Sequence, residues 1–181
     1  MIMMEEFKTL ELELKEAIRD VPDFPKKGIL FKDITPLLKN GPLFKKTINF
    51  FANRLKDYSF DAIVCIESRG FLLGAPLAAQ LGVGVIPVRK KGKLPRPTCK
   101  ATYQLEYGLD CLEIHKEDLK KGDRVLLVDD VLATGGTISA VIELVKNLGC
   151  EIVEIAFLIE LLFLQGRKKL ENHPVFSLIQ Y

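Results

Sequence analysis

The sequence VLLVDDVLATGGT, at residues 125–137, decides the fold class of this chain. It begins with an apolar run, which is followed by two adjacent carboxylates, Asp129 and Asp130. Two glycines then precede a segment of helical periodicity. Val and Leu without polar alternation are typical of a strand whose two faces are both covered by helices. We therefore predict a buried parallel strand, a tight turn and the start of a helix.

The same order of strand, turn and helix surrounds this stretch. Upstream, an apolar run at 60–67 is followed by the turn SRG and by a helical pattern at 71–81. Further apolar runs predict strands at 83–89, 151–161 and 175–181. The predicted fold class is α/β, with a doubly wound, mainly parallel central sheet flanked by helices.

Two further regions bear on the site, the N-terminal region at 1–55 and the region at 90–112. Residues 1–20 and 43–55 have the apolar spacing of amphipathic helices, and residues 23–40, which contain proline and glycine, predict an ordered loop or a short strand. Residues 90–112 contain two prolines and no clear long helix, which predicts an irregular functional loop or lid. Ligands of open α/β sheets bind outside the carboxyl ends of the strands, so the turns and this loop are candidate site segments.

Composition sets the broad class. The chain has 181 residues, of which 48% are hydrophobic and 28% charged, and this fits one globular domain over 1–181 rather than a disordered chain. Lys plus Arg number 26 against 24 for Asp plus Glu, so no overall field favours nucleic acid. The four cysteines form no C-x-x-C pair, and no apolar run is long enough for a bilayer. We expect a cytoplasmic protein without a nucleic-acid or membrane partner.

The turn at the end of the central strand has the chemistry of a phosphate site. Glycines let backbone N–H groups approach an anion, and the hydroxyls of Thr134 and Thr137 add donors at a helix N-terminus. Asp129 and Asp130 can accept hydrogen bonds from sugar hydroxyls or act on a hydrated Mg²⁺. Phosphate and diol together indicate a ribose 5-phosphate. The alternatives are a core strand that ends at a helix-capping aspartate, and a receiver-type phosphoacceptor, which would not need Thr-Gly-Gly-Thr.

This element resembles the phosphoribosyl pyrophosphate signature of the type I phosphoribosyltransferases. Segments at 23–38, 67–78 and 88–108 resemble the adenine phosphoribosyltransferase branch of that family, and the resemblance runs from about Pro22 to Tyr181. It implies the type I fold, with a small N-terminal hood over about 1–40, a mobile catalytic loop over about 90–112, and a homodimer. It also implies Mg²⁺-dependent transfer of 5-phosphoribosyl from phosphoribosyl pyrophosphate to N9 of adenine, giving AMP and pyrophosphate.

The resemblance also implies roles for individual residues. The 5-phosphate would bind Ala133, Thr134, Gly135, Gly136 and Thr137. The pyrophosphate would bind Ser68, Arg69, Gly70, Arg89 and Lys93. The adenine would contact Leu30, Phe31, Lys32 and Val131. Asp129 and Asp130 would hold the ribose hydroxyls, no side chain would bind the metal directly, and Mg²⁺ would come with the substrate, through water to one of this pair.

Two loop residues complete the implied site. Glu106 matches the proposed general acid or base near the purine imidazole ring, and Tyr107 would position the loop. Lys32 departs from the family pattern, because many members carry Arg there. Taken alone, Ser68 and Arg69 fit a helix cap and a solvated cation, Glu106 fits an ordinary surface glutamate, and the basic run at 89–100 fits a solvated or nucleic-acid-binding face.

Three other functions remain open at the level of sequence. The first is a sister enzyme that acts on xanthine, hypoxanthine, guanine or orotate. The second is a regulator that senses phosphoribosyl pyrophosphate without turnover, although such regulators usually carry an added DNA-binding domain. The third is a Rossmann-like binding module, against which the set of Arg69, Glu106, Asp129 and Asp130 argues.

Overall fold

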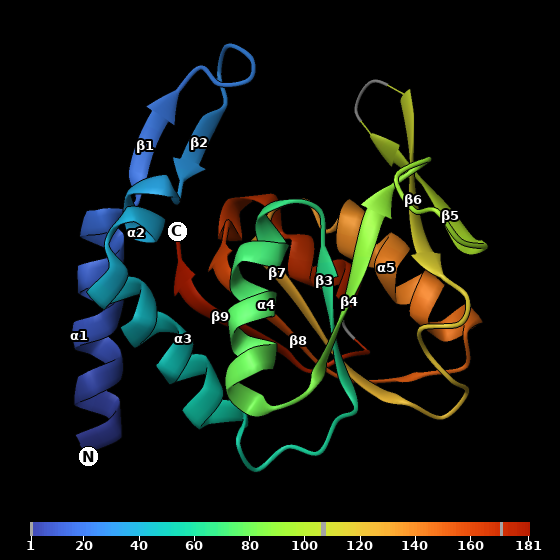
Figure 1. Cartoon of the computed structure of the whole chain (residues 1–181). Helices are drawn as coiled ribbons and strands as arrows, with labels where there is room; N and C mark the ends of the chain where they lie inside the picture. Colours follow the sequence, from blue (N-terminus) through green and yellow to red (C-terminus); the bar gives the residue numbers. More distant parts are fainter. Residues whose placement is uncertain (1, 106–107, 171) are drawn as a thin grey trace. The chain divides into compact units, whose positions relative to one another are not determined.

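The computed structural model describes residues 2–105, 108–170 and 172–181 (Figure 1). The chain divides into two compact units, Met1–Arg54 and Leu55–Tyr181. The prediction of one domain over the whole chain stays a prediction. None of the helices in the described part of the chain has both the length and the apolar character needed to cross a bilayer.

The first unit is mainly helical. Its elements are α1 (Ile2–Ala17), β1 (Arg19–Pro22), β2 (Leu30–Asp33), α2 (Thr35–Lys39) and α3 (Gly41–Leu55). The two expected helices are confirmed, and β1 and β2 pair as an antiparallel ribbon. The short helix α2 was not predicted, because it contains too few residues to show a periodic pattern.

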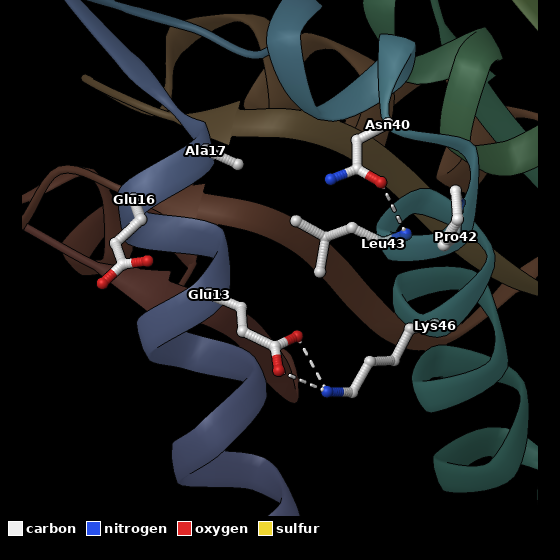
Figure 2. A pocket seen from close by; sticks show the side chains of 7 residues that line it. All are labelled: Glu13, Glu16, Ala17, Asn40, Pro42, Leu43 and Lys46. Carbon is white, nitrogen blue, oxygen red and sulfur yellow. Dashed lines mark hydrogen bonds and ion pairs between the residues drawn. The ribbon is translucent and has the colours of Figure 1, made fainter.

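A cavity of about 500 Å³ opens between α1 and α3 within this unit (Figure 2). Both carboxylate oxygens of Glu13 lie 2.8 Å from Lys46 Nζ, and Asn40 Oδ1 accepts a hydrogen bond from the Leu43 amide at 3.2 Å. The opposite charges across the cavity therefore neutralise each other.

The second unit is built on a seven-stranded sheet in the order β5-β6-β4-β3-β7-β8-β9. Its helices and strands are β3 (Ala62–Ile66), α4 (Arg69–Leu81), β4 (Gly84–Lys90), β5 (Thr98–Leu105), β6 (Gly108–His115), β7 (Arg124–Leu132), α5 (Gly136–Asn147), β8 (Glu151–Glu160) and β9 (Val175–Gln180), with short 3-10 turns η1 (Leu162–Leu164) and η2 (Gly166–Leu170). Along the sheet, the neighbours β4, β3, β7, β8 and β9 pair in parallel. Strand β6 pairs antiparallel with β4, and β5 pairs antiparallel with β6. The predicted fold class is confirmed.

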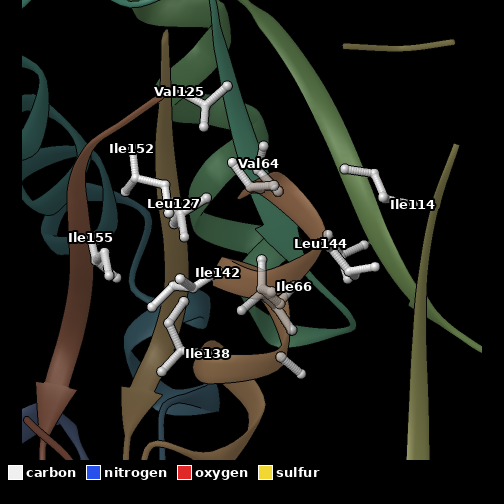
Figure 3. Close-up of a cluster of buried hydrophobic side chains, with 14 of the residues drawn as sticks. Val64, Ile66, Ile114, Val125, Leu127, Ile138, Ile142, Leu144, Ile152 and Ile155 are labelled. Carbon is white, nitrogen blue, oxygen red and sulfur yellow. The ribbon is translucent and has the colours of Figure 1, made fainter. Parts of the chain in front are cut away.

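Helices α4 and α5 cover opposite faces of this sheet. Strand residues alternate between faces, and Cys65 of β3 lies under Gly74 of α4, whereas Val64 and Ile66 belong to the core formed with α5. Figure 3 shows these two side chains with Val125 of β7 and the apolar residues of α5. Strand β3 is therefore held between α4 on one face of the sheet and α5 on the other.

The segment at 90–112 differs from the irregular loop that the sequence predicted. It contains most of an antiparallel hairpin, in which β5 and β6 pair from Thr98 with His115 to Leu105 with Gly108. Among the hairpin residues whose burial is described, the buried apolar positions are Ala101, Leu112 and Ile114. Small residues alternating with Lys and Thr give β5 a weak strand signal, which explains the error.

Gly74 tests the packing of α4 on β3. A Cβ at Gly74 would lie 1.9 Å from Cys65 Sγ, so Gly74→Ala forces the two elements apart. We expect a loss of about 1–3 kcal/mol in the free energy of unfolding, measured by urea denaturation. Cys65→Ala removes the obstructing sulfur, so the double variant should lose less than the sum of the single losses. Additive losses would contradict this packing.

Candidate active site

The candidate site lies where three neighbouring strands end. Strand β3 pairs with β4 on one side and with β7 on the other, all in parallel. The segments that follow them begin at Glu67, at Lys91 and at Ala133, so they meet at one edge of the sheet. This is the edge at which open α/β sheets bind their ligands.

The predicted phosphate turn joins β7 to α5. The strand runs to Leu132, two residues beyond the predicted acid end, and α5 begins at Gly136. Gly135 has a φ of 77°, in the left-handed region, and its carbonyl accepts bonds from the amide and hydroxyl of Ser139 at 3.1 and 2.7 Å. Thr134 is exposed beside this helix N-terminus. The turn therefore has the backbone geometry and polarity that favour an anion.

The two carboxylates of the strand end differ in their surroundings. Asp129 Oδ1 accepts a hydrogen bond from the Asp130 amide at 2.9 Å, and Asp130 Oδ2 lies 2.8 Å from Arg69 Nε. Burial, and then the charge of Asp130, raise the pKa of Asp129. Burial also raises the pKa of Asp130, and the charge of Arg69 opposes that change. The pair thus favours hydroxyl donors or positive charge beside it.

The segment after β3 packs directly on this acid pair. The peptide between Glu67 and Ser68 is cis, and Ser68 takes the N-cap position of α4 without a side-chain capping bond. A Cβ at Gly70 would lie 2.9 Å from Asp129 Oδ1, so only glycine lets α4 begin this close to β7. Arg69 is paired with Asp130 and is therefore not simply a solvated cation.

Glu67 brings the other two predicted pyrophosphate residues together, although no role was predicted for it. Its carboxylate lies 3.3 Å from Arg89 Nε and forms an ion pair with Lys93 Nζ, and the Lys90 amide donates to it at 2.9 Å. Burial alone would raise the pKa of Glu67, but the bonds from Lys93, Lys90 and Arg89 lower it to about 2. An ionised carboxylate therefore holds two cations at the strand ends.

Other cations of the basic run have carboxylate partners within the chain. Lys90 Nζ lies 3.3 Å from Asp110, and Lys100 Nζ lies 3.1 Å from Glu113. Arg96 donates to Asp118 at 2.6 Å. These three cations of the run are therefore paired with carboxylates of the same chain.

Tyr103 is a second site neighbour that the sequence did not indicate. It lies on β5, and its hydroxyl donates to Asp110 Oδ2 at 3.2 Å and interacts with Thr137 of the phosphate turn. Burial raises the pKa of Tyr103. No local pattern marks this residue, because its partner lies on another element.

The predicted base-binding residues fall in different units. Leu30, Phe31 and Lys32 lie on β2 of the first unit, where Lys32 pairs with Asp20 at 2.6 Å. Val131 lies on β7 of the second unit, so their combination into one pocket stays a prediction. Glu106 and Tyr107 lie outside the described residues.

Comparison with known proteins decides the family. A model of the phosphoribosyl transferase domain matches residues 34–179. The chain belongs to the phosphoribosyltransferase family. Within it, the chain is 58% identical to the adenine phosphoribosyltransferase of Geobacter metallireducens over 169 residues, which are 93% of this chain and 99% of that protein.

Solved structures of adenine phosphoribosyltransferases have the same fold as this family member. That of Thermoanaerobacter pseudethanolicus has a TM-score of 0.91 and 55% identity, and covers 94% of this chain and 99% of its own. That of Saccharomyces cerevisiae, complexed with an imino-altritol bisphosphate and adenine, has a TM-score of 0.91, 48% identity and the same coverage. The chain is therefore placed in the adenine branch of the phosphoribosyltransferases.

The lowered pKa of Glu67 makes stability depend on pH. A folded-state value of about 2, below the ordinary 4.5, means that the ionised group stabilises the fold above pH 4.5 and loses this effect as pH falls toward 2. Glu67→Gln should cost about 2 kcal/mol of unfolding free energy at pH 7, measured by urea denaturation. The difference in unfolding free energy between this variant and the parent chain should become smaller below pH 4.5. The exposed Glu143→Gln variant is the control, and a gap that does not change with pH would refute the argument.

Proposed function

We propose that this phosphoribosyltransferase transfers the 5-phosphoribosyl group of phosphoribosyl pyrophosphate to N9 of adenine and releases AMP and pyrophosphate. The observation that carries the proposal is the Arg69–Asp130 contact of 2.8 Å, which joins the pyrophosphate segment to the ribose and phosphate segment. The high identity to adenine phosphoribosyltransferases supports adenine as the base.

The phosphoribosyl half of the substrate is held at the end of β7. The 5-phosphate accepts hydrogen bonds from the turn at 133–137, and the ribose hydroxyls donate to Asp129 and Asp130. Carboxylates next to the ring stabilise the positive charge that develops as the bond to pyrophosphate breaks. The desolvation that raises the pKa of Asp129 supports this role, because a nearby positive charge then stabilises the ionised form.

The leaving pyrophosphate is held by the segments after β3 and β4. Ser68, Arg69 and Gly70 begin α4, and Arg89 and Lys93 are held beside them by Glu67. Arginine can clamp phosphate oxygens through two parallel N–H donors. Asp129 or Asp130 would hold Mg²⁺ through water, and the metal would supply further neutralisation of the charge on the diphosphate. Buried Asp130, half-buried Asp129 and the adjoining Arg69 fit such a metal-carried substrate.

The base is the least constrained part of the proposal. Leu30, Phe31 and Lys32 cover the adenine from the hood and Val131 lines the opposite side. Glu106 exchanges a proton with the purine imidazole ring, and Tyr107 positions the closing loop, which excludes water from the activated ribosyl group.

A homodimer and a cytoplasmic location complete the proposal. Leu72 of α4 and Val85 of β4 are 45% and 42% exposed, which supports a dimer contact around α4. All four cysteines are free thiols, which supports a reducing compartment.

A purine panel tests the reaction and the base together. The purified chain receives Mg²⁺ and phosphoribosyl pyrophosphate with adenine, hypoxanthine, guanine, xanthine or orotate, and nucleotide and pyrophosphate are both quantified. We expect AMP from adenine alone. Product from another base would overturn the base assignment and leave the phosphate and ribose sites intact. Binding of phosphoribosyl pyrophosphate without any product would indicate a sensor.

The acid pair is tested by the double variant Asp129→Asn, Asp130→Asn. The amides keep the size of the side chains and the bond from the Asp130 backbone, but they lose the negative charge that favours the transition state. We expect kcat to fall by about 100-fold or more, measured with saturating substrates. The exposed Asp57→Asn variant should keep the parent rate. A double variant with the parent kcat would exclude an electrostatic role for the pair.

A further inference from the structure

We propose that Gly166 and Arg167 form a brace that sets the position of the 5-phosphate turn, so that Arg167 and its partner Glu160 are positioning residues for phosphoribosyl pyrophosphate. This inference rests on the proposed function, because it assigns the turn at 133–137 to the 5-phosphate. The brace lies outside the substrate-binding residues derived above and comes from the chain after β8.

The first observation is a backbone contact without room for a side chain. A Cβ at Gly166 would lie 2.1 Å from the Ala133 carbonyl oxygen and 2.9 Å from the Gly135 amide nitrogen. A Cβ at Gly135 would in turn lie 2.7 Å from the Gly166 carbonyl oxygen. The start of η2 and the phosphate turn therefore pack with their backbones in direct contact.

The second observation is what holds Gly166 in place. The Arg167 guanidinium donates through Nε and Nη2 to the two carboxylate oxygens of Glu160, at 2.8 and 2.5 Å, and through Nη1 to the Val175 carbonyl at 2.9 Å. Glu160 is 3% exposed and also accepts from Ser177 Oγ at 2.7 Å. A planar fork on a buried carboxylate fixes direction as well as distance.

The segment from Leu161 to Gly166 contacts the end of β7 at its start and the phosphate turn at its end. The Leu161 amide donates to the Leu132 carbonyl at 2.9 Å, at the last residue of β7. From there the chain passes through η1 and returns at Gly166 to contact residues 133 and 135. The segment is thus anchored to the strand that carries the acid pair, and the Arg167–Glu160 pair fixes its return.

A specific kinetic effect follows from this arrangement. Displacing Gly166 displaces the Ala133 carbonyl and the Gly135 amide, which belong to the proposed 5-phosphate site. The pyrophosphate segments and the proposed base contacts have no part in the brace. Loss of the brace should therefore weaken binding of the phosphoribosyl half and leave adenine binding unchanged.

Gly166→Ala and Arg167→Met test the brace from its two ends. Gly166 is not in the left-handed region, so alanine is opposed there by contact and not by backbone conformation. We expect the KM for phosphoribosyl pyrophosphate to rise about tenfold or more in both variants, because small displacements of binding groups are costly. The KM for adenine should stay within about twofold of the parent.

Matched controls separate positioning from general damage. Gly84→Ala makes the same change where no atom lies within 4 Å of the new Cβ, and Lys168→Met removes a neighbouring exposed charge. Both should keep the parent KM values. Thermal unfolding of every variant is recorded, and if Gly166→Ala does not fold, Arg167→Met decides the question.

Direct titration of ribose 5-phosphate by calorimetry separates this inference from the proposed function. If the parent chain binds ribose 5-phosphate and the two brace variants bind it more weakly, the result supports the brace. This holds whether or not the chain turns over a base. A parent chain that makes no nucleotide would overturn the proposed function alone. Parent-like KM and binding in folded brace variants, or a lower unfolding temperature alone, would show that the contact is only structural.

Discussion

The site depends on backbone contacts at the carboxyl end of β7 that exclude any side chain. Gly70, in the first turn of α4, lies against Asp129, and Gly135 faces Gly166 across the phosphate turn. At each contact a Cβ would lie within 3.0 Å of another atom, so one methyl group would separate the segments. Three parts of the chain that are far apart in sequence therefore meet at the end of one strand.

Charge pairing then orients the polar groups that this packing brings together. Asp130 holds Arg69, and Glu67 holds Arg89 and Lys93. In each case a buried or nearly buried carboxylate restrains a longer and more flexible cation, which reduces the conformational freedom of that cation before any ligand binds.

Much of this arrangement could be predicted from the sequence, because its signals are local. The apolar strand, the acid pair and the two glycines are consecutive, and the order of strands places the turns at one edge of the sheet. The hairpin of β5 and β6 was missed because its burial comes from tertiary contacts rather than from residue type. Glu67 and Tyr103 were missed for a related reason, since their roles depend on partners carried by other elements.

Gly166 shows why a local motif cannot fix the geometry of its own turn. The sequence at 133–137 supplies the donors and the left-handed glycine, but the Ala133 carbonyl and the Gly135 amide contact a residue about thirty positions further along the chain. The next residue, Arg167, donates hydrogen bonds to a carboxylate on β8 and to a carbonyl on β9. The sheet edge opposite to the hairpin thus takes part in shaping the phosphate turn, although it contributes none of the predicted binding groups. A chain with the same turn and a different segment after β8 would present the same donors in a different direction, and directed donors are what distinguish a phosphate site from an exposed helix end.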